Sequence, residues 1–159
     1  MNLNIVYIGP LSFPLGYAST KRRRYMVDYM NEQHITSHIL STRYKKSKSI
    51  TNPSIGKYGS DASYCDISHL FKPSSITLYY KTGKKKLKEW YVPDKKNILI
   101  FHTNLPVEDF PFFQYGLKLG YKIVFDQVET SYIAKGTEAS FKRKCFFKKI
   151  KKICRKRIL

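Results

Sequence analysis

The sequence predicts an α/β fold, a Rossmann-like parallel sheet with helices on both faces. Short apolar runs rich in β-branched residues alternate with helical patterns along the chain. Glycine or proline stands where several of these elements should end. A length of 159 residues is enough for one domain with its own core. We expect that domain over residues 1–141, followed by a basic amphipathic helix over residues 142–159.

The first βαβ unit is expected within about forty residues. Leu3–Ile8 is a β-branched apolar run before Gly9-Pro10, as in a buried parallel strand. Ser19 or Thr20 is expected to cap a helix that ends near Asn31. The predicted inward positions of this helix are apolar, namely Tyr25, Met26, Tyr29 and Met30. The run Ile35–Leu40 follows as the second strand of the unit.

The middle of the chain has a weaker pattern. Residues 43–75 are rich in Ser, Lys, Gly and Pro, which indicates a long excursion over the surface. Ile76–Tyr80 is expected to be a strand, and the spacing of Leu87, Trp90 and Tyr91 indicates a short helix that closes before Pro93. A hairpin that turns at Thr82-Gly83 is the alternative.

A second βαβ unit follows. Asn97–His102 has the pattern of a buried strand, and Lys122–Asp126 has that of the next one. Between them a helix is predicted over Val107–Leu119, with Gly120 as its terminator. The aromatic and aliphatic residues expected to face inward from this helix are Phe110, Phe113 and Leu117.

The net charge of +19 is unevenly distributed. Residues 142–157 hold ten Lys or Arg and no acid, and their apolar residues recur on one side of a helix. We expect Lys142–Arg157 to contact an anionic membrane surface. A solvated charged face is the alternative, and a nucleic-acid partner is the weakest of the three.

Cysteine usage and the amino terminus predict a cytoplasmic location, and the basic segment 142–157 would place the chain peripherally on the inner face of the cell membrane. Three cysteines with no C-x-x-C spacing favour neither a disulfide framework nor a zinc site. The first residues lack the basic and apolar regions of a signal peptide, and no apolar run approaches about 18 residues.

The loop Gly9–Ser19 joins the first strand to the first helix, where backbone amides and the helix dipole can attract an anionic group. Gly16 would allow close approach of a ligand to the backbone. The loop lacks the G-x-G-x-x-G and P-loop spacings, which disfavours nicotinamide and ATP sites. An ordinary turn between strand and helix is the alternative.

Three polar residues are predicted at the carboxyl ends of adjacent strands, where open parallel sheets bind ligands. His102 follows one strand, where its imidazole would orient or deprotonate a substrate hydroxyl. Asp126 and Glu129 follow the next strand and need hydrogen-bond partners, which would be loop amides, a substrate hydroxyl or a base. A capping role at the strand ends is the structural alternative for all three.

Four segments of the chain resemble one known family. Gly120–Glu129, preceded by Ile98–His102, resembles bacterial family-four glycosyltransferases, as do the opening Asn4–Gly9 and the loop Gly16–Ser19 before a basic helix. The resemblance implies the amino-terminal half of a GT-B fold with two Rossmann-like domains. It also implies retaining sugar transfer from a nucleotide carrier, generally without a metal at the catalytic centre.

The resemblance implies roles for single residues. His102 would lie beside the reacting sugar, and Asp126 and Glu129 would form the acidic motif at the strand end, which makes these three the catalytic candidates. The substrate-binding candidates come from the loop near the donor diphosphate and the helix after it: Gly16, Tyr17, Ala18, Ser19 and Lys21. No metal and no cofactor is expected.

We therefore expect the acceptor-binding domain of a hexosyltransferase that serves polysaccharide or glycolipid assembly. Its partners would be a nucleotide-sugar donor, held by a second domain that this chain lacks, and a sugar or lipid-linked acceptor. The chain is expected to be truncated and inactive alone. The alternatives are a basic peripheral module that binds membrane or polyanion without catalysis, and an unfolded remnant of a disrupted gene.

Overall fold

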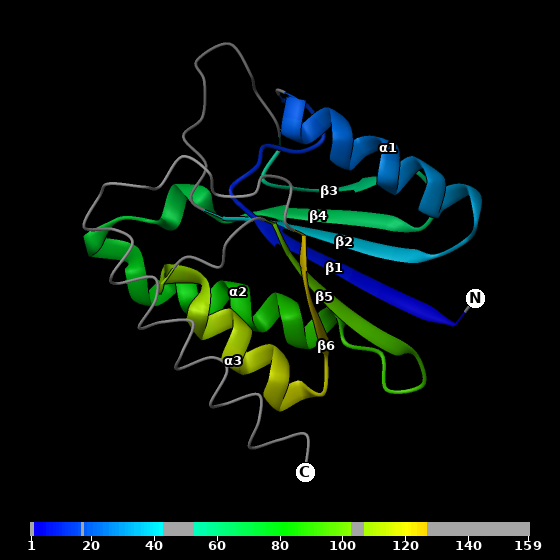
Figure 1. Cartoon of the computed structure of the whole chain (residues 1–159). Helices are drawn as coiled ribbons and strands as arrows, with labels where there is room; N and C mark the ends of the chain where they lie inside the picture. The colour runs from blue at the N-terminus through cyan, green and yellow to red at the C-terminus, as the bar shows by residue number, and fades with distance from the viewer. Residues whose placement is uncertain (1, 17, 43–52, 103–106, 127–159) are drawn as a thin grey trace, which may run out of the picture. The chain divides into compact units, whose positions relative to one another are not determined.

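A computed structural model of the chain describes residues 2–16, 18–42, 53–102 and 107–126. These residues form a six-stranded sheet with the order β3-β4-β2-β1-β5-β6 (Figure 1). Neighbouring strands are parallel except for β3 and β4, which are antiparallel. The strands are β1 Leu3–Gly9, β2 Thr36–Ser41, β3 Ile55–Tyr58, β4 Ala62–Asp66, β5 Lys96–His102 and β6 Lys122–Asp126. The predicted α/β Rossmann-like fold is confirmed.

The strand order reverses at β1, the central strand of the sheet. From β1 the chain passes outward to β2 and β4, and it then returns to β5 on the other side of β1. Val6 and Ile8 of β1 are completely buried, as expected for a strand between two parallel neighbours. In open α/β sheets a crevice forms at such a reversal, beyond the carboxyl ends of the strands.

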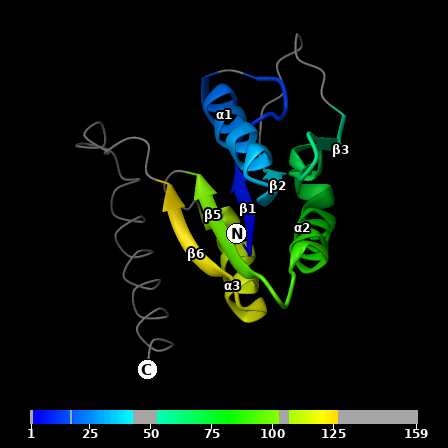
Figure 2. The same cartoon turned by 90° about the vertical axis from the view of Figure 1, so that its right-hand side faces the viewer.

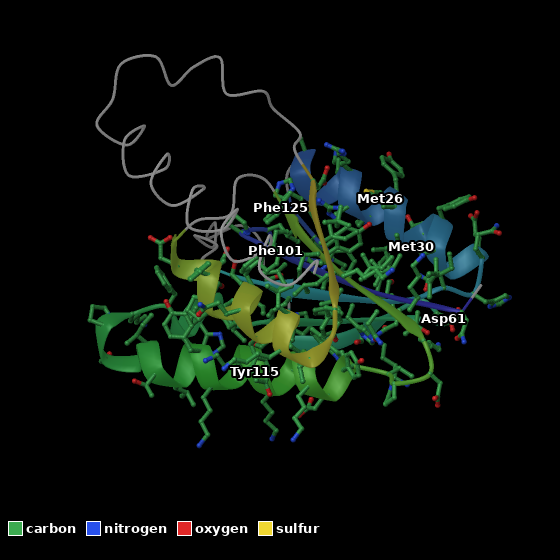
Figure 3. All side chains as sticks on the ribbon, turned by 60° about the horizontal axis from the view of Figure 1, so that its bottom comes forward. Met26, Met30, Asp61, Phe101, Tyr115 and Phe125 are labelled. Carbon is green, nitrogen blue, oxygen red and sulfur yellow. The ribbon has the colours of Figure 1, made fainter. Side chains whose placement is uncertain are left out.

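Helices cover both faces of the sheet. Helix α1 (Ala18–Glu32) lies on one face, and α2 (Ile76–Trp90) and α3 (Phe110–Leu119) lie together on the other (Figure 3). Short 3-10 turns at Ser68–Leu70, Pro73–Ser75 and Val107–Asp109 lead into the last two helices. Helix α3 ends at Gly120, whose φ of 96° is readily adopted only by glycine. None of the helices in the described part of the chain is both long and apolar enough to span a bilayer.

Helix α1 differs from its prediction in the face it buries. Met26 and Met30 pack against the core, but Tyr25 is 73% exposed and Tyr29 is 61% exposed. Arg23 and Val27 lie fully inside instead. The apolar pattern was misleading because Arg23, whose charge is paired, occupies an inward position of the helix. The rings of Tyr25 and Tyr29 lie on the exposed side.

The start of α1 also differs. The helix begins at Ala18, so Ser19 and Thr20 lie within it rather than capping it. The hydroxyl Oγ1 of Thr20 donates a hydrogen bond to the carbonyl oxygen of Ser12 at 2.6 Å. Thr20 therefore fastens the preceding loop to the first turn of the helix.

The predicted surface excursion over residues 43–75 is wrong for part of its length. Within residues 53–75, β3 and β4 form a hairpin, and β4 pairs with β2 through the register Ser37↔Ala62 to Ser41↔Asp66. Tyr64 and Cys65 of β4 are buried. This strand has few β-branched residues, and tertiary packing rather than local preference determines it.

Helix α2 confirms the predicted helix around Leu87 and Trp90 that closes before Pro93, but it replaces the predicted strand over Ile76–Tyr80 and the alternative hairpin. It is one continuous helix from Ile76 to Trp90, without a strand at its start or a turn at Gly83. Its buried residues are Tyr79, Gly83 and Leu87, which recur every fourth position and form one stripe. The ring of Phe112 from α3 fills the place where a side chain at Gly83 would lie.

Helix α3 and strand β6 follow their predictions with two differences. Phe113 is buried as expected, but Phe112 is also fully buried, whereas Phe110 and Leu117 are only partly covered. Strand β6 ends the described sheet, and Val124 and Phe125 are 44% and 37% exposed. Figure 3 shows Phe125 close to Phe101 of β5, and their ring centroids are 6.0 Å apart.

Candidate functional site

Three neighbouring strands end at one edge of the sheet, and Figure 2 shows β1, β5 and β6 pointing the same way. Their last residues are Gly9, His102 and Asp126. His102 and Asp126 are paired in the β5–β6 register. A Cβ atom at Gly9 would lie 2.6 Å from Cβ of His102. The lack of a side chain at Gly9 therefore leaves room for the imidazole at the point of strand reversal.

The loop from β1 to α1 is held against the core beside this edge. Leu11 and Phe13 are each 1% exposed, and the Phe13 ring meets the rings of Tyr58 and Tyr64. A Cβ at Gly16 would collide with the Thr20 side chain. The peptide bond between Phe13 and Pro14 is cis. The described part of the loop is thus fixed by its own apolar side chains.

A buried arginine joins the strand ends. Arg23, in the second turn of α1, has a side chain that is 1% exposed. Its Nη2 atom lies 2.8 Å from Oδ2 of Asp126 and 3.0 Å from Nδ1 of His102. The guanidinium carbon lies 4.1 Å from the centre of the Tyr7 ring, within cation-π range. We call Tyr7, Arg23, His102 and Asp126 the rim cluster.

A second arginine completes the pairing of the carboxylate. Nη2 of Arg22 lies 3.3 Å from Oδ1 of Asp126, so each carboxylate oxygen has a guanidinium partner. The Arg22 side chain is 47% exposed, whereas that of Asp126 is 17% exposed. The inner pair with Arg23 is the stronger of the two, because it is shorter and shielded from water.

The charges of the cluster shift its pKa values. Burial acts to raise the pKa of the Asp126 carboxyl, but its hydrogen bond with Arg23 and the charges of both arginines lower that pKa below the ordinary value. Burial lowers the pKa of the His102 imidazole, and Arg23 lowers it further. Near neutral pH, two guanidinium cations, one carboxylate and a neutral imidazole leave the strand ends with a positive excess.

The structure brings His102 and Asp126 together, as expected from neighbouring strand ends. Of the substrate-binding candidates, Gly16 packs on Thr20, Ala18 is the first residue of α1, and Lys21 is exposed on its surface. Lys21 has no ion pair with any described residue. Tyr17, the side chain of Ser19 and Glu129 lie outside the described residues.

Sequence reasoning missed Arg22 and Arg23. Both stand in the run Lys21–Arg24, which belongs to a helix that was identified from the sequence only as basic. A signal was present, because Arg23 lies three residues after Thr20 and four before Val27, and all three are buried on one face. Of the three kinds of partner expected for Asp126, the structure shows a basic side chain of the protein itself.

The amino-terminal ends of β1 and β5 have a structural role. The side-chain amide of Asn4 donates to the carbonyl oxygens of Trp90 and of the Asn97 side chain, at 2.6 and 2.7 Å. The Asn97 amide in turn donates to the backbone carbonyl oxygens of Val92 and Lys95. These hydrogen bonds hold the connection from α2 to β5 and use the amide donors of both asparagines, whereas Oδ1 of Asn4 has no partner among the described residues.

The rim cluster is suited to an oxygen-rich ligand. It presents the exposed guanidinium of Arg22 and the partly exposed His102 and Asp126 side chains at an edge where ligands bind in this class of sheet. Among the described residues, no three His, Cys, Asp or Glu side chains are close enough to hold a metal ion. No protein-family model, curated protein or solved structure matches the chain.

Proposed function

We propose that this chain is the acceptor-side domain of a glycosyltransferase that moves a sugar from a nucleotide-sugar to a polysaccharide or glycolipid acceptor. The observation that carries the proposal is the meeting of His102, Asp126 and Arg23 at the point where the strand order reverses. The resemblance of Ile98–His102 and Gly120–Glu129 to family-four glycosyltransferases supports it.

The geometry of the cluster suits hydroxyl groups. Sugar binding needs donors and acceptors that are held in place, because each flexible side chain that is ordered on binding reduces affinity. Arg23 is locked by burial and by its contacts with Asp126, His102 and Tyr7. The strand-end backbone holds His102 and Asp126, which are adjacent in the register.

The chain is proposed to supply one side of a two-domain active site. The nucleotide-sugar would be held mainly by a second domain, and the β1–α1 loop would approach its diphosphate. The positive excess from Arg22 and Arg23 would favour that anionic group. We expect the chain alone to bind sugar ligands weakly and to transfer no sugar.

Saturation-transfer NMR on the full chain tests this function. The probes are maltose, chitobiose, UDP-glucose and GDP-mannose. At least one should receive saturation, and His102→Ala should reduce its affinity by about fivefold, the effect of one hydrogen bond. His34→Ala is the matched control, because His34 is an exposed histidine paired with Asp61 in the turn after β3. Absence of binding by all four probes, or equal losses in both variants, would contradict the proposal.

A basic peripheral module is the second candidate. Lys81, Lys85 and Lys88 are exposed along α2, and the basic segment 142–157 lies outside the described residues. Such a module would bind vesicles of anionic lipid more strongly than neutral ones, in a manner that weakens with salt. Sedimentation with vesicles of phosphatidylserine and of phosphatidylcholine distinguishes the two candidates. The basic module is supported if His102→Ala leaves vesicle binding unchanged and no sugar probe binds.

A further inference from the structure

We propose that Arg23 fixes His102 as the tautomer with its proton on Nε2, so that this histidine is a hydrogen-bond donor to a substrate oxygen. A guanidinium group has only donors, and it stays protonated in proteins. Nη2 of Arg23 lies 3.0 Å from Nδ1 of His102. Nδ1 must therefore accept, and the single proton of the neutral ring is on Nε2.

The opposite tautomer has no suitable partner in the cluster. A proton on Nδ1 would have to point to Oδ2 of Asp126, which is 3.8 Å away and beyond hydrogen-bond range. The same oxygen already accepts from Arg23 at 2.8 Å. A proton on Nδ1 would also face the hydrogen atoms of the guanidinium group. Arg23 thus disfavours this tautomer in two ways, because it occupies the Asp126 oxygen and because it directs its own protons at Nδ1.

A doubly protonated ring is disfavoured for related reasons. The His102 side chain is 11% exposed, so an imidazolium would lose most of its hydration. It would also place a second cation against Arg23, whose own side chain is 1% exposed. Asp126 opposes this effect, but its two oxygens are shared with Arg22 and Arg23.

The tautomer decides between the two roles expected for His102. With Nδ1 occupied by Arg23 and Nε2 protonated, the ring has no free lone pair with which to remove a proton from an acceptor hydroxyl. No described side chain forms a hydrogen bond with Nε2, and we assign its N–H group as the donor to a ligand. The identity of that ligand rests on the proposed function, and a hydroxyl or phosphate oxygen meets the requirement. Arg23 is thereby a positioning residue that acts through His102.

The tautomer can be measured without any ligand. Two-bond ¹H–¹⁵N correlation spectra of the ¹⁵N-labelled full chain, near neutral pH, distinguish a protonated from an unprotonated ring nitrogen. His102→Gln assigns the signals, since the chain has four histidines. We expect Nδ1 of His102 to be unprotonated and Nε2 to be protonated. A proton on Nδ1, or protons on both nitrogens, would overturn the inference.

Two variants test whether Arg23 is the cause. Arg23→Met should convert the His102 signals into a mixture of tautomers, whereas Arg22→Met should leave them unchanged, because Arg22 contacts only Asp126 in the cluster. If Arg23→Met keeps a pure Nε2 tautomer, another group must fix it. The wild-type spectrum alone decides the tautomer if Arg23→Met does not fold.

The donor role is tested with a sugar probe that binds. His102→Gln keeps an N–H donor and should retain most of the affinity, whereas His102→Ala should lose about fivefold. Equal losses in the two variants would reject the donor role. Failure of every probe to bind would reject the proposed function. The tautomer inference would not be affected, because its measurement uses no ligand.

Discussion

The buried Arg23 is the residue on which the candidate site depends. Its guanidinium is removed from water and compensated by Asp126, His102 and the face of Tyr7. The compensation is incomplete, since Nε of Arg23 and the Tyr7 hydroxyl have no hydrogen-bond partner within the described part of the chain. Replacing a buried ion pair by apolar residues is often neutral for stability, so such an arrangement is weak evidence for a structural role. This is consistent with the functional role that we propose for the rim cluster.

Removal of Arg23 should be costly. Arg23→Met leaves the Asp126 carboxylate with only its exposed partner Arg22, and we expect a loss of about 3 kcal/mol in the free energy of unfolding, as for other buried pairs that lose one member. Arg22→Met, the matched control on the same carboxylate, should lose less than about 1 kcal/mol. Urea unfolding followed by circular dichroism measures both. Equal losses would mean that the Arg23–Asp126 pair contributes no more to the free energy of unfolding than the Arg22–Asp126 pair.

The sequence predicted two residues of the rim cluster and missed the other two. His102 and Asp126 were visible because each directly follows an apolar run, and the strand register then makes them neighbours. Arg23 was hidden in a run of four basic residues, and Tyr7 lies inside a strand. Which basic residue of such a run turns inward depends on the packing of the helix, which composition does not reveal.

Among the elements, α2 shows how packing overrides local preference. Its sequence contains Gly83 at the centre and a threonine before it, which is typical of a turn. Helix α2 remains continuous because Gly83 lets it approach α3, where Phe112 is completely buried. The glycine that suggested a break is thus the contact point between two helices.

Substitution of Gly83 tests that contact. Gly83→Ala should gain up to about 1 kcal/mol from helix propensity, but it places a methyl group against the ring of Phe112 and near Ile67. Overpacking costs about 1–3 kcal/mol, so we expect a net loss of stability. Lys85→Ala on the exposed side of the same helix is the control and should change little. A more stable Gly83→Ala protein would show that α2 and α3 are not in close contact.

Strand β2 provides a test that depends on pH. The His38 ring stacks on Trp90 with centroids 4.8 Å apart, and its Nδ1 lies 2.7 Å from Oγ of Ser63. Burial, with a smaller contribution from Lys95, lowers the pKa of His38 to about 4. The unfolded chain therefore binds a proton near its ordinary pKa of about 6.5, while the folded protein does not.

Stability should consequently be lost as pH falls from about 6.5 towards about 4, by as much as about 3 kcal/mol from His38. His102 contributes in the same direction, because its pKa is also lowered. Urea unfolding at several pH values should show a steeper loss in the wild type than in His38→Gln. Parallel pH profiles for the two proteins would indicate that the His38 ring is not excluded from water.

At the scale of elements, short apolar runs made strands predictable, including the partly exposed β6. Strands β1, β5 and β6 were placed within a residue of their observed bounds, since each is a short apolar run. Strand β4 was missed because its sequence, Ala-Ser-Tyr-Cys-Asp, has no strong local preference and is ordered by pairing with β2. The inward face of α1 was predicted wrongly because Arg23, one of four consecutive basic residues, was not expected to be buried.

For the molecule as a whole, topology does most to locate the site. Two βαβ units on either side of β1 make the strand order reverse there, which brings the carboxyl ends of β1, β5 and β6 to one edge. The sequence predicted a parallel sheet with a ligand site at the carboxyl ends of its strands, but the strand order came from the structure. The sugar and acceptor that would bind at that edge depend on pocket contacts, which no motif in the chain specifies.

The most direct test of the central claim is an amide ¹H–¹⁵N titration of the full chain with maltose, chitobiose, UDP-glucose and GDP-mannose. Binding of at least one probe should shift the signals of Gly9, Arg23, His102 and Asp126, and Asp126→Asn should abolish those shifts while the protein stays folded. Shifts confined to the exposed lysines of α2, or none with any probe, would contradict a sugar-binding role for the rim cluster.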